Sequence, residues 1–289
     1  MKRLIYDVLL LCFLAVSQTT FADKYKIVCV YETQTKGNQE IYNTVLEGIK
    51  SKAGDIQTLL IPDSTESLKQ QIDQAGPDKI IALGRSPAET VAALAYRDKT
   101  VAGLFPFNAS SFNGVSLVLS DKSLAAKLTQ FIPNIRRIFF IQEQGFKTIE
   151  TNKGVNIPGL KIIAIDGNDS LSTSRELGRI VENEATPYDA VFLPANLSDE
   201  ILFNLALTAW EKNVKLFSTN IGHLENGALM AFYPNPRALG EQIGELAKRN
   251  NIGYETAAKI DVALNRRIAQ HLGVKFDPAV DALFSVKIK

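Results

Sequence analysis

The chain has 289 residues with 32 basic and 31 acidic side chains, so its formal net charge is +1. Because charge is so evenly balanced, we expect no basic face and neither nucleic acid nor an anionic membrane surface as a partner. The length allows one large domain or two lobes that each bury a core. The sequence therefore has to distinguish an enzyme from a protein that binds a small molecule.

Residues 1–22 have the pattern of a secretory signal peptide. Lys2 and Arg3 precede an apolar stretch at 8–16, which is too short to span a bilayer. We expect cleavage after Ala22 and a periplasmic or secreted location. Without this leader the chain carries 30 basic and 30 acidic side chains, because Lys2, Arg3 and one aspartate are removed.

The chain has two cysteines, Cys12 and Cys29. The bulky Leu11 before Cys12 argues against a lipoprotein acylation site, which requires a small residue there. After cleavage Cys29 would be the remaining cysteine. We therefore expect no internal disulfide and a fold that depends on its apolar core.

In the first half of the chain, short apolar runs alternate with segments of helical periodicity. We expect strands over residues 26–31, 58–61, 79–83 and 100–104, and helices over 39–52, 67–75 and from Ser86 onwards. This alternation predicts parallel strands joined by right-handed crossovers.

A second alternating series follows an aromatic loop at 105–113. We expect extended segments over 114–119, 137–142, 160–165, 190–193, 214–218 and 228–232, with helices over 122–131, 172–183 and 198–212 and an irregular stretch at 145–159. The two similar halves indicate an internal structural duplication, although no repeat is visible at the residue level.

The tail, with a helix at 236–249, an extended segment at 259–264 and a short helix at 266–272, has to be shared between the halves. Gly240 and Gly244 would permit close packing of the first helix. We therefore predict an α/β protein of two Rossmann-like lobes with parallel sheets, joined by a hinge that the chain crosses several times. The expected lobes are residues 23–118 with 234–255, and residues 119–233 with 256–289.

The turn at 84–88, GRSPA, follows a buried strand and approximates the nucleophile elbow of serine hydrolases. In that elbow the residue after the serine donates a backbone N–H to the oxyanion hole, and Pro87 has none. Ala88 also replaces the closing glycine of the motif. These departures disfavour a hydrolase.

The chain has two histidines, His223 and His271, to serve as a catalytic base. His223 is expected to be a solvated loop residue, and His271 a surface or packing residue on a short helix. The sequence contains no HxH, HExxH or CxxC motif and no glycine-rich phosphate loop, so we expect no metal, no cofactor and no catalytic residues.

Polar and aromatic side chains follow the predicted strands at their carboxyl ends, where open parallel sheets bind ligands. From the first half these candidates are Tyr31, Glu32, Thr33, Ser86, Phe105 and Phe107, and from the second they are Gln142, Glu143, Asn196, Thr219 and Asn220.

Several of these side chains have alternative structural interpretations. Ser86 is expected to cap its helix, with Glu89 completing a capping box, and whether Ser86 also contacts a ligand stays open. Phe105 and Phe107 could pack in the core or hinge. Trp210 is expected in the core instead of forming a ligand platform.

Three motifs resemble the exported substrate-binding proteins of ABC transporters that have the type I periplasmic binding protein fold. Gly227-Ala228-Leu229, followed by Leu239-Gly240 and Gly244, is similar to the family's GAL…LG…G segment. Gly114-Val115-Ser116 and the segment NRRIAQHLGV at 265–274 resemble two further landmarks. The similarity covers nearly all of the chain beyond the leader.

The resemblance implies two lobes that close on a small solute, an aromatic amino acid or similar compound in several relatives, and delivery to a membrane permease. It implies that the helix start at Ser86 receives a carboxylate. Asn196 and Asn235 stand where the family has acidic residues, so an ammonium group would need Glu32 or Glu143 as its partner.

We therefore expect a monomeric solute-binding protein that captures a small organic ligand, aromatic or carboxylate-bearing, for an ABC-type importer. A sensory or adaptor protein that signals to a membrane partner is the alternative on the same fold. A serine hydrolase centred on Ser86 is a distant third.

Overall fold

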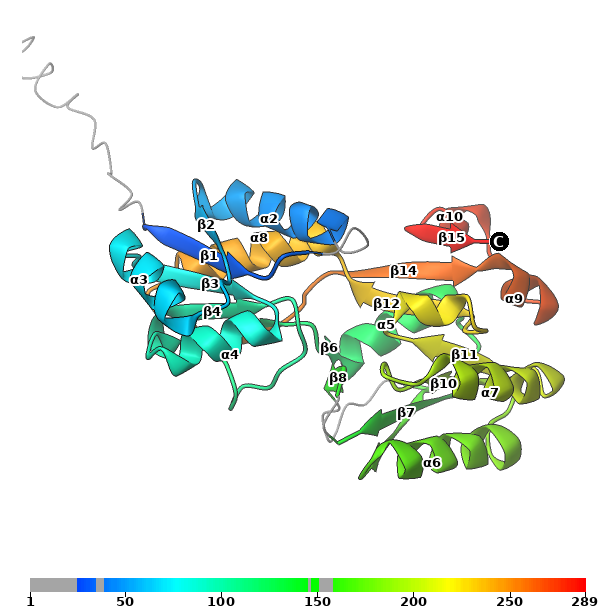
Figure 1. Ribbon diagram of the computed structural model, residues 1–289. Coiled ribbons are helices and arrows are strands. Elements are labelled where there is room, and N and C mark those ends of the chain that lie inside the picture. The colour runs from blue at the N-terminus through cyan, green and yellow to red at the C-terminus, as the bar shows by residue number, and fades with distance from the viewer. Residues whose placement is uncertain (1–24, 35–38, 145–146, 151–157) are drawn as a thin grey trace, which may run out of the picture.

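The computed structural model describes residues 25–34, 39–144, 147–150 and 158–289 (Figure 1). The expected leader at 1–22 lies outside the described residues, as does part of the segment at 145–159. Two α/β lobes lie side by side, each built on its own sheet. The predicted fold class is confirmed.

The first lobe contains a six-stranded sheet of order β13-β5-β4-β3-β1-β2, in which all neighbours pair in parallel. Its strands are β1 (Ile27–Tyr31), β2 (Gln57–Leu60), β3 (Lys79–Leu83), β4 (Thr100–Gly103), β5 (Gly114–Ser116) and β13 (Tyr254–Thr256). Every residue of β3 is buried, as its continuous apolar run predicts for a central strand.

Helices cover both faces of this sheet (Figure 1). They are α2 (Gln39–Ala53), α3 (Thr65–Ala75), α4 (Arg85–Ala93), the 3₁₀ turn η1 (Arg97–Lys99) and α8 (Pro236–Ala247). Alternate strand residues face opposite sides. Cys29 and Ile81 pack with residues of α2 and α8, whereas Val30 and Ile80 pack with residues of α3 and α4.

Helices α2 and α8 pack almost backbone to backbone because glycines face each other. A Cβ atom at Gly240 would overlap the carbonyl oxygen of Val45, and one at Gly48 would overlap the carbonyl oxygen of Arg237. At Gly244 a Cβ atom would lie 2.7 Å from the carbonyl oxygen of Ile49. The close packing predicted from the small residues of α8 is confirmed.

The second lobe contains a seven-stranded sheet of order β15-β14-β12-β11-β10-β7-β9, and its β12–β14 pair is antiparallel. Its strands are β7 (Arg137–Glu143), β9 (Lys161–Gly167), β10 (Asp189–Phe192), β11 (Lys215–Ser218), β12 (Met230–Pro234), β14 (Ile260–Asn265) and β15 (Val286–Ile288). Four buried rings, Phe140, Phe192, Phe217 and Phe232, pack together with centroid separations of 5.1–6.2 Å.

Helices and short elements complete the second lobe. They are α5 (Asp121–Phe131), α6 (Ser170–Asn183), α7 (Asp199–Glu211), η2 (Ile221–Leu224), α9 (Arg266–His271) and α10 (Pro278–Asp281), with the small sheet of β6 (Leu119–Ser120) and β8 (Ile149–Glu150). The side chains of Asp169 and Ser198 cap the amino ends of α6 and α7.

The chain passes between the sheets three times, after β5, between β12 and α8, and between β13 and β14. Strand β12 ends at Pro234 and α8 begins at Pro236, so the second passage is confined to Asn235. The Asn235 side chain accepts from the N–H of Ala238 at 2.8 Å and donates to Asp261 Oδ2 at 2.7 Å. Division of the chain into lobes after residues 118, 233 and 255 remains our proposal.

Candidate functional site

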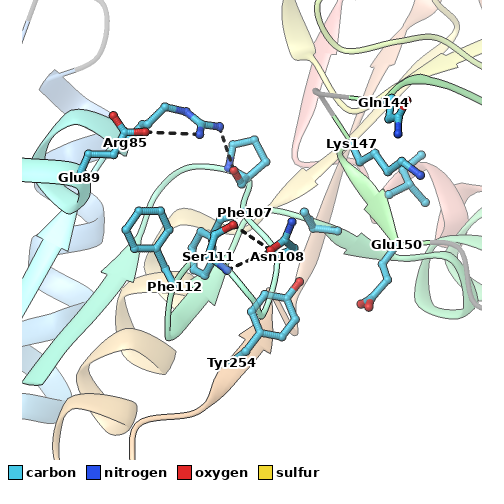
Figure 2. Close-up of a pocket in the computed structure, with 13 residues that line it drawn as sticks. Arg85, Glu89, Phe107, Asn108, Ser111, Phe112, Gln144, Lys147, Glu150 and Tyr254 are labelled. Carbon is cyan, nitrogen blue, oxygen red and sulfur yellow. Dashed lines mark hydrogen bonds and ion pairs between the residues drawn. The ribbon is translucent and has the colours of Figure 1, made fainter. Parts of the chain in front are cut away.

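A cleft of about 530 Å³ lies between the two lobes, beyond the carboxyl ends of β3 and β4 (Figure 2). Both lobes contribute to it. The lining residues are Arg85, Glu89, Pro106, Phe107, Asn108, Ser111, Phe112 and Tyr254 from the first lobe, Val118 from the first passage, and Gln144, Lys147, Ile149 and Glu150 from the segment after it.

Three rings, Phe107, Phe112 and Tyr254, form an aromatic wall on the first-lobe side of the cleft (Figure 2). The centroid of Phe107 lies 5.8 Å from that of Phe112 and 5.8 Å from that of Tyr254, and both contacts are edge-to-face. Phe105 supports Phe107 at 4.9 Å without lining the cleft. The wall offers ring faces and edges to an apolar or aromatic ligand.

The buried hydroxyl of Ser116 holds the loop that carries the aromatic wall. Ser116 Oγ accepts the backbone N–H of Phe107 at 2.9 Å and donates to the carbonyl oxygen of Phe107 at 2.8 Å. It also accepts the N–H of Val118 at 3.2 Å. Because Ser116 ends β5 and Val118 lies on the first passage, this hydroxyl links the aromatic wall to the hinge.

Asn108 closes the tip of the same loop. Its Oδ1 atom accepts the N–H of Ser111 at 3.1 Å and the hydroxyls of Ser110 and Ser111 at 2.7 and 2.8 Å. Asparagine favours such side-chain to backbone turns. The loop is therefore held from both its base and its tip.

Both walls of the cleft carry one cation and one anion. On the first-lobe side, Arg85 donates to the Pro106 carbonyl at 3.2 Å and lies 3.8 Å from Glu89. On the second-lobe side, Lys147 pairs with Asp166 at 2.5 Å, outside the cleft lining, and Glu150 is exposed. The cleft thus has no net formal charge.

Tyr254 contributes a hydroxyl as well as a ring. Burial and the nearby Glu150 carboxylate raise the pKa of Tyr254, so its phenol keeps its proton at neutral pH. The group can therefore donate a hydrogen bond to a ligand in the cleft.

Among the eleven side chains expected to bind a ligand, Phe107 lines the cleft. Glu143 and Asn196 come together elsewhere, in a hollow of about 210 Å³ between the amino ends of α6 and α7. There Glu143 Oε2 accepts Asn196 Nδ2 at 2.8 Å and Ser170 Oγ at 2.7 Å.

The side chain of Gln142 is buried beneath β8. Its Nε2 atom donates to the carbonyl of Ile149 at 2.9 Å, and its Oε1 atom accepts the N–H groups of Thr148 and Ile149 at 3.0 and 2.9 Å. These bonds anchor the strand that carries Ile149 and Glu150 into the cleft.

Thr219 and Asn220 also bond to neighbouring loops. Thr219 Oγ1 donates to Thr148 Oγ1 at 3.0 Å, and Asn220 Nδ2 donates to the carbonyl of Ala195 at 3.1 Å. Tyr31 lies half-buried 6.1 Å from Tyr42, and the following residues Glu32 and Thr33 are exposed.

The expected helix start at Ser86 is wrong. Helix α4 begins at Arg85 with Gly84 as its N-cap, and no side chain caps it. Gly84 has φ = 106°, which a residue with a Cβ rarely adopts, so the chain turns into the helix two residues earlier than Pro87 suggests. Ser86 is consequently an exposed first-turn residue, and Glu89 faces Arg85 instead of forming a capping box.

His223 is buried, so the prediction of a solvated loop residue is wrong. Its Nδ1 atom lies 2.8 Å from Ser218 Oγ, which also accepts the N–H of Asn220 at 2.9 Å. Burial lowers the pKa of His223, so the imidazole of this pair is neutral at neutral pH. Although the pair resembles two thirds of a catalytic triad, both side chains are buried away from any substrate.

Burial lowers the pKa of His223, which makes folding stability depend on pH. The unfolded chain binds this proton more readily, so the stabilisation is complete above about pH 6.5 and decreases as pH falls towards the folded pKa. We expect the free energy of unfolding, measured by urea titration at several pH values, to decrease on acidification. His223→Asn should flatten this response and His271→Asn should retain it; an unchanged response in His223→Asn would contradict the prediction.

The described residues show no thiolate nucleophile and no metal site. Burial raises the pKa of the Cys29 thiol to about 12, so it is not a thiolate nucleophile at neutral pH. No cluster of three histidine, cysteine or acidic side chains in the described part is arranged to hold a metal ion. Nor does that part contain a helix long and apolar enough to cross a membrane.

The cleft residues that sequence reasoning missed include Arg85, Phe112, Lys147 and Tyr254. Arg85 and Phe112 stand next to predicted features, in the 84–88 turn and the aromatic loop, and could have been included on that ground. Lys147 lies in the irregular stretch after β7, and Tyr254 lies in a three-residue strand without a recognisable pattern.

None of the family models matches the chain, and neither does any curated protein sequence. Solved structures do match over most of its length. A ligand-free, open substrate-binding protein with adhesive properties from Clostridium difficile is 18% identical, with 92% of this chain and 100% of that chain covered and a TM-score of 0.60. A domain from Streptococcus pneumonia in complex with L-Trp is 14% identical, with 91% and 99% covered and a TM-score of 0.54.

A third structure, a conserved domain protein from Vibrio cholerae, is 15% identical, with 92% and 100% of the two chains covered and a TM-score of 0.51. At these identities the likeness establishes the fold, which is that of the type I periplasmic binding proteins. The fold expected from the sequence motifs is confirmed.

Proposed function

We propose that this chain is an exported solute-binding protein that captures a small organic ligand in the cleft between its lobes and delivers it to an ABC-type importer. The observation that carries the proposal is the cleft itself, because side chains of both lobes line one hollow next to the hinge. A ligand held by both walls stabilises the closed arrangement, since contacts from both lobes exist together in that state.

The chemistry of the cleft favours a ligand with an aromatic or apolar ring and a carboxylate. The ring would lie against Phe107, Phe112 and Tyr254. The carboxylate would meet Arg85 or Lys147, and Glu150 would meet any cationic group. The related structure in complex with L-Trp supports a ligand of this size. We propose no catalytic role, because the described residues that line the cleft include no cysteine and no histidine.

Native mass spectrometry of freshly purified protein, followed by thermal-shift titration with aromatic acids and amino acids, tests this proposal. A ligand that binds the folded protein raises the melting temperature, and above its Kd the shift grows with the logarithm of the ligand concentration. A protein that carries no solute and responds to none of these compounds would contradict solute capture.

Replacing Phe107 or Tyr254 by alanine is expected to weaken binding of the solute so identified by about tenfold each, because each ring contributes about 1.5 kcal/mol of contact. Isothermal titration calorimetry measures the change. Tyr188→Ala is the matched control, because this ring is 52% exposed on the second lobe and does not line the cleft. Equal affinities in all three variants would place the ligand elsewhere.

A further inference from the structure

Helix α7 is apolar on its outer face as well as its inner face. Leu202, Leu205 and Ala209 pack into the core of the second lobe. On the outer face, Phe203 is 57% exposed and Leu207 is 47% exposed. A surface helix normally carries polar residues there, and an exposed apolar stripe marks an interaction surface.

The exposed stripe continues to Trp210 and borders a groove of about 320 Å³. Positions 203, 207 and 210 are spaced to lie on one helical face. The opposite wall of the groove is formed by residues 225–227, Arg267 and Ile268 of α9, and Ile288. Figure 1 shows α7 and α9 on the part of the second lobe that lies away from the first lobe, so the stripe and the interlobe cleft are separate surfaces.

The two ends of this stripe carry opposite charges. Glu200 is one turn before Phe203 on the same face of the helix, and it is exposed. At the other end the guanidinium carbon of Arg267 lies 5.9 Å from the ring centroid of Trp210. Among the described residues, Asp281 pairs with the neighbouring Arg266 and with Lys287, whereas no ion pair includes Glu200 or Arg267.

We propose that the stripe Glu200–Phe203–Leu207–Trp210 is a dimer interface that pairs with the same stripe of a second copy. A two-fold axis between the copies places the two α7 helices antiparallel. In such a symmetric contact each residue pair occurs twice, with the two copies exchanged. This arrangement buries Phe203 and Leu207 of both copies. It also brings Glu200 of each copy to Arg267 of the other.

The charge pattern is the reason for choosing a second copy as the occupant. A stripe with an acid at one end and a base at the other is complementary to itself when reversed, and the exchange forms two ion pairs at once. A lipid surface offers no matching arrangement of one acid and one base at opposite ends of an apolar stripe. The proposed dimer differs from the monomer expected from the sequence, and it leaves the interlobe cleft of each copy accessible.

Sedimentation velocity over a wide range of protein concentration tests the interface. We expect a concentration-dependent species of twice the monomer mass for the unmodified protein. Leu207→Glu should remain monomeric because it buries a charge at the centre of the interface. Leu171→Glu, on α6 and 59% exposed, is the control and should dimerise normally. A monomer at every concentration would overturn the proposal, even if the stripe then bound vesicles or another protein.

Charge-reversal variants distinguish loss of this interface from a general loss of folding as the cause of a missing dimer. Glu200→Arg and Arg267→Glu are each expected to weaken the dimer by about tenfold, because symmetry removes two exposed ion pairs at once. The double variant should regain the affinity of the unmodified protein. If the double variant dimerises no better than the single variants, the antiparallel pairing is wrong. Solute binding is measured separately, so neither result depends on the proposed ligand.

Discussion

Replacing Gly240 by alanine is expected to lower the free energy of unfolding by about 3 kcal/mol. The added Cβ atom would overlap the carbonyl oxygen of Val45 and lie 3.0 Å from the backbone nitrogen of Ile49. Both atoms belong to the backbone of α2, so no side chain can move aside and the helices have to separate. Urea denaturation followed by far-ultraviolet circular dichroism measures the loss.

Gly178→Ala is the matched control for this prediction. Gly178 also lies within a helix, α6, but a Cβ atom there would meet no atom within 4 Å. Alanine has the higher helix propensity, so this change should stabilise the protein by up to about 1 kcal/mol. Equal effects of the two substitutions would show that the α2–α8 contact is looser than described.

Replacing Ser116 by alanine is expected to destabilise the protein by about 3 kcal/mol and to release the loop that carries the aromatic wall. The substitution leaves the buried N–H groups of Phe107 and Val118 without their acceptor, and each such group costs about 1–3 kcal/mol. Hydrogen exchange measured by mass spectrometry should show faster exchange in residues 105–112. Calorimetry should show weaker solute binding.

Ser51→Ala provides the comparison, because Ser51 makes one hydrogen bond, to the carbonyl of Gly48 in its own helix at 2.7 Å. It should change stability by less than about 1 kcal/mol and leave exchange in 105–112 unaltered. Protection of that loop in Ser116→Ala at the level of Ser51→Ala would contradict the link between hinge and cleft.

The architecture followed from the sequence because each strand and helix carries a strong periodic signal. Apolar runs such as 79–83 and the glycines of α8 report burial and close packing directly, and both predictions were confirmed. The short elements β13, α10 and β15 were missed, since three or four residues carry too little pattern to distinguish a strand or helix from a loop. The antiparallel position of β14 depends on tertiary pairing that no local pattern encodes.

The cleft was harder to predict than the fold. The rule that ligands bind at strand ends pointed to the end of the first sheet at which the cleft and Phe107 lie. It could not predict which polar side chains would instead bond to neighbouring loops. The side chains of Gln142, Thr219 and Asn220 form hydrogen bonds with neighbouring loops. Tyr254 enters the cleft because β13 joins the first sheet late in the chain, which is a property of topology and not of local sequence.

That late return of α8 and β13 to the first lobe also constrains when the lobe can fold during synthesis. The ribosome releases the chain from its amino end, and domains usually fold as they emerge. Here the face of α2 that carries Gly48 packs on α8, and the edge of β5 pairs with β13, so both lack these partners until residues 236–256 have been made. We therefore expect the first lobe to complete its fold only when synthesis is nearly finished.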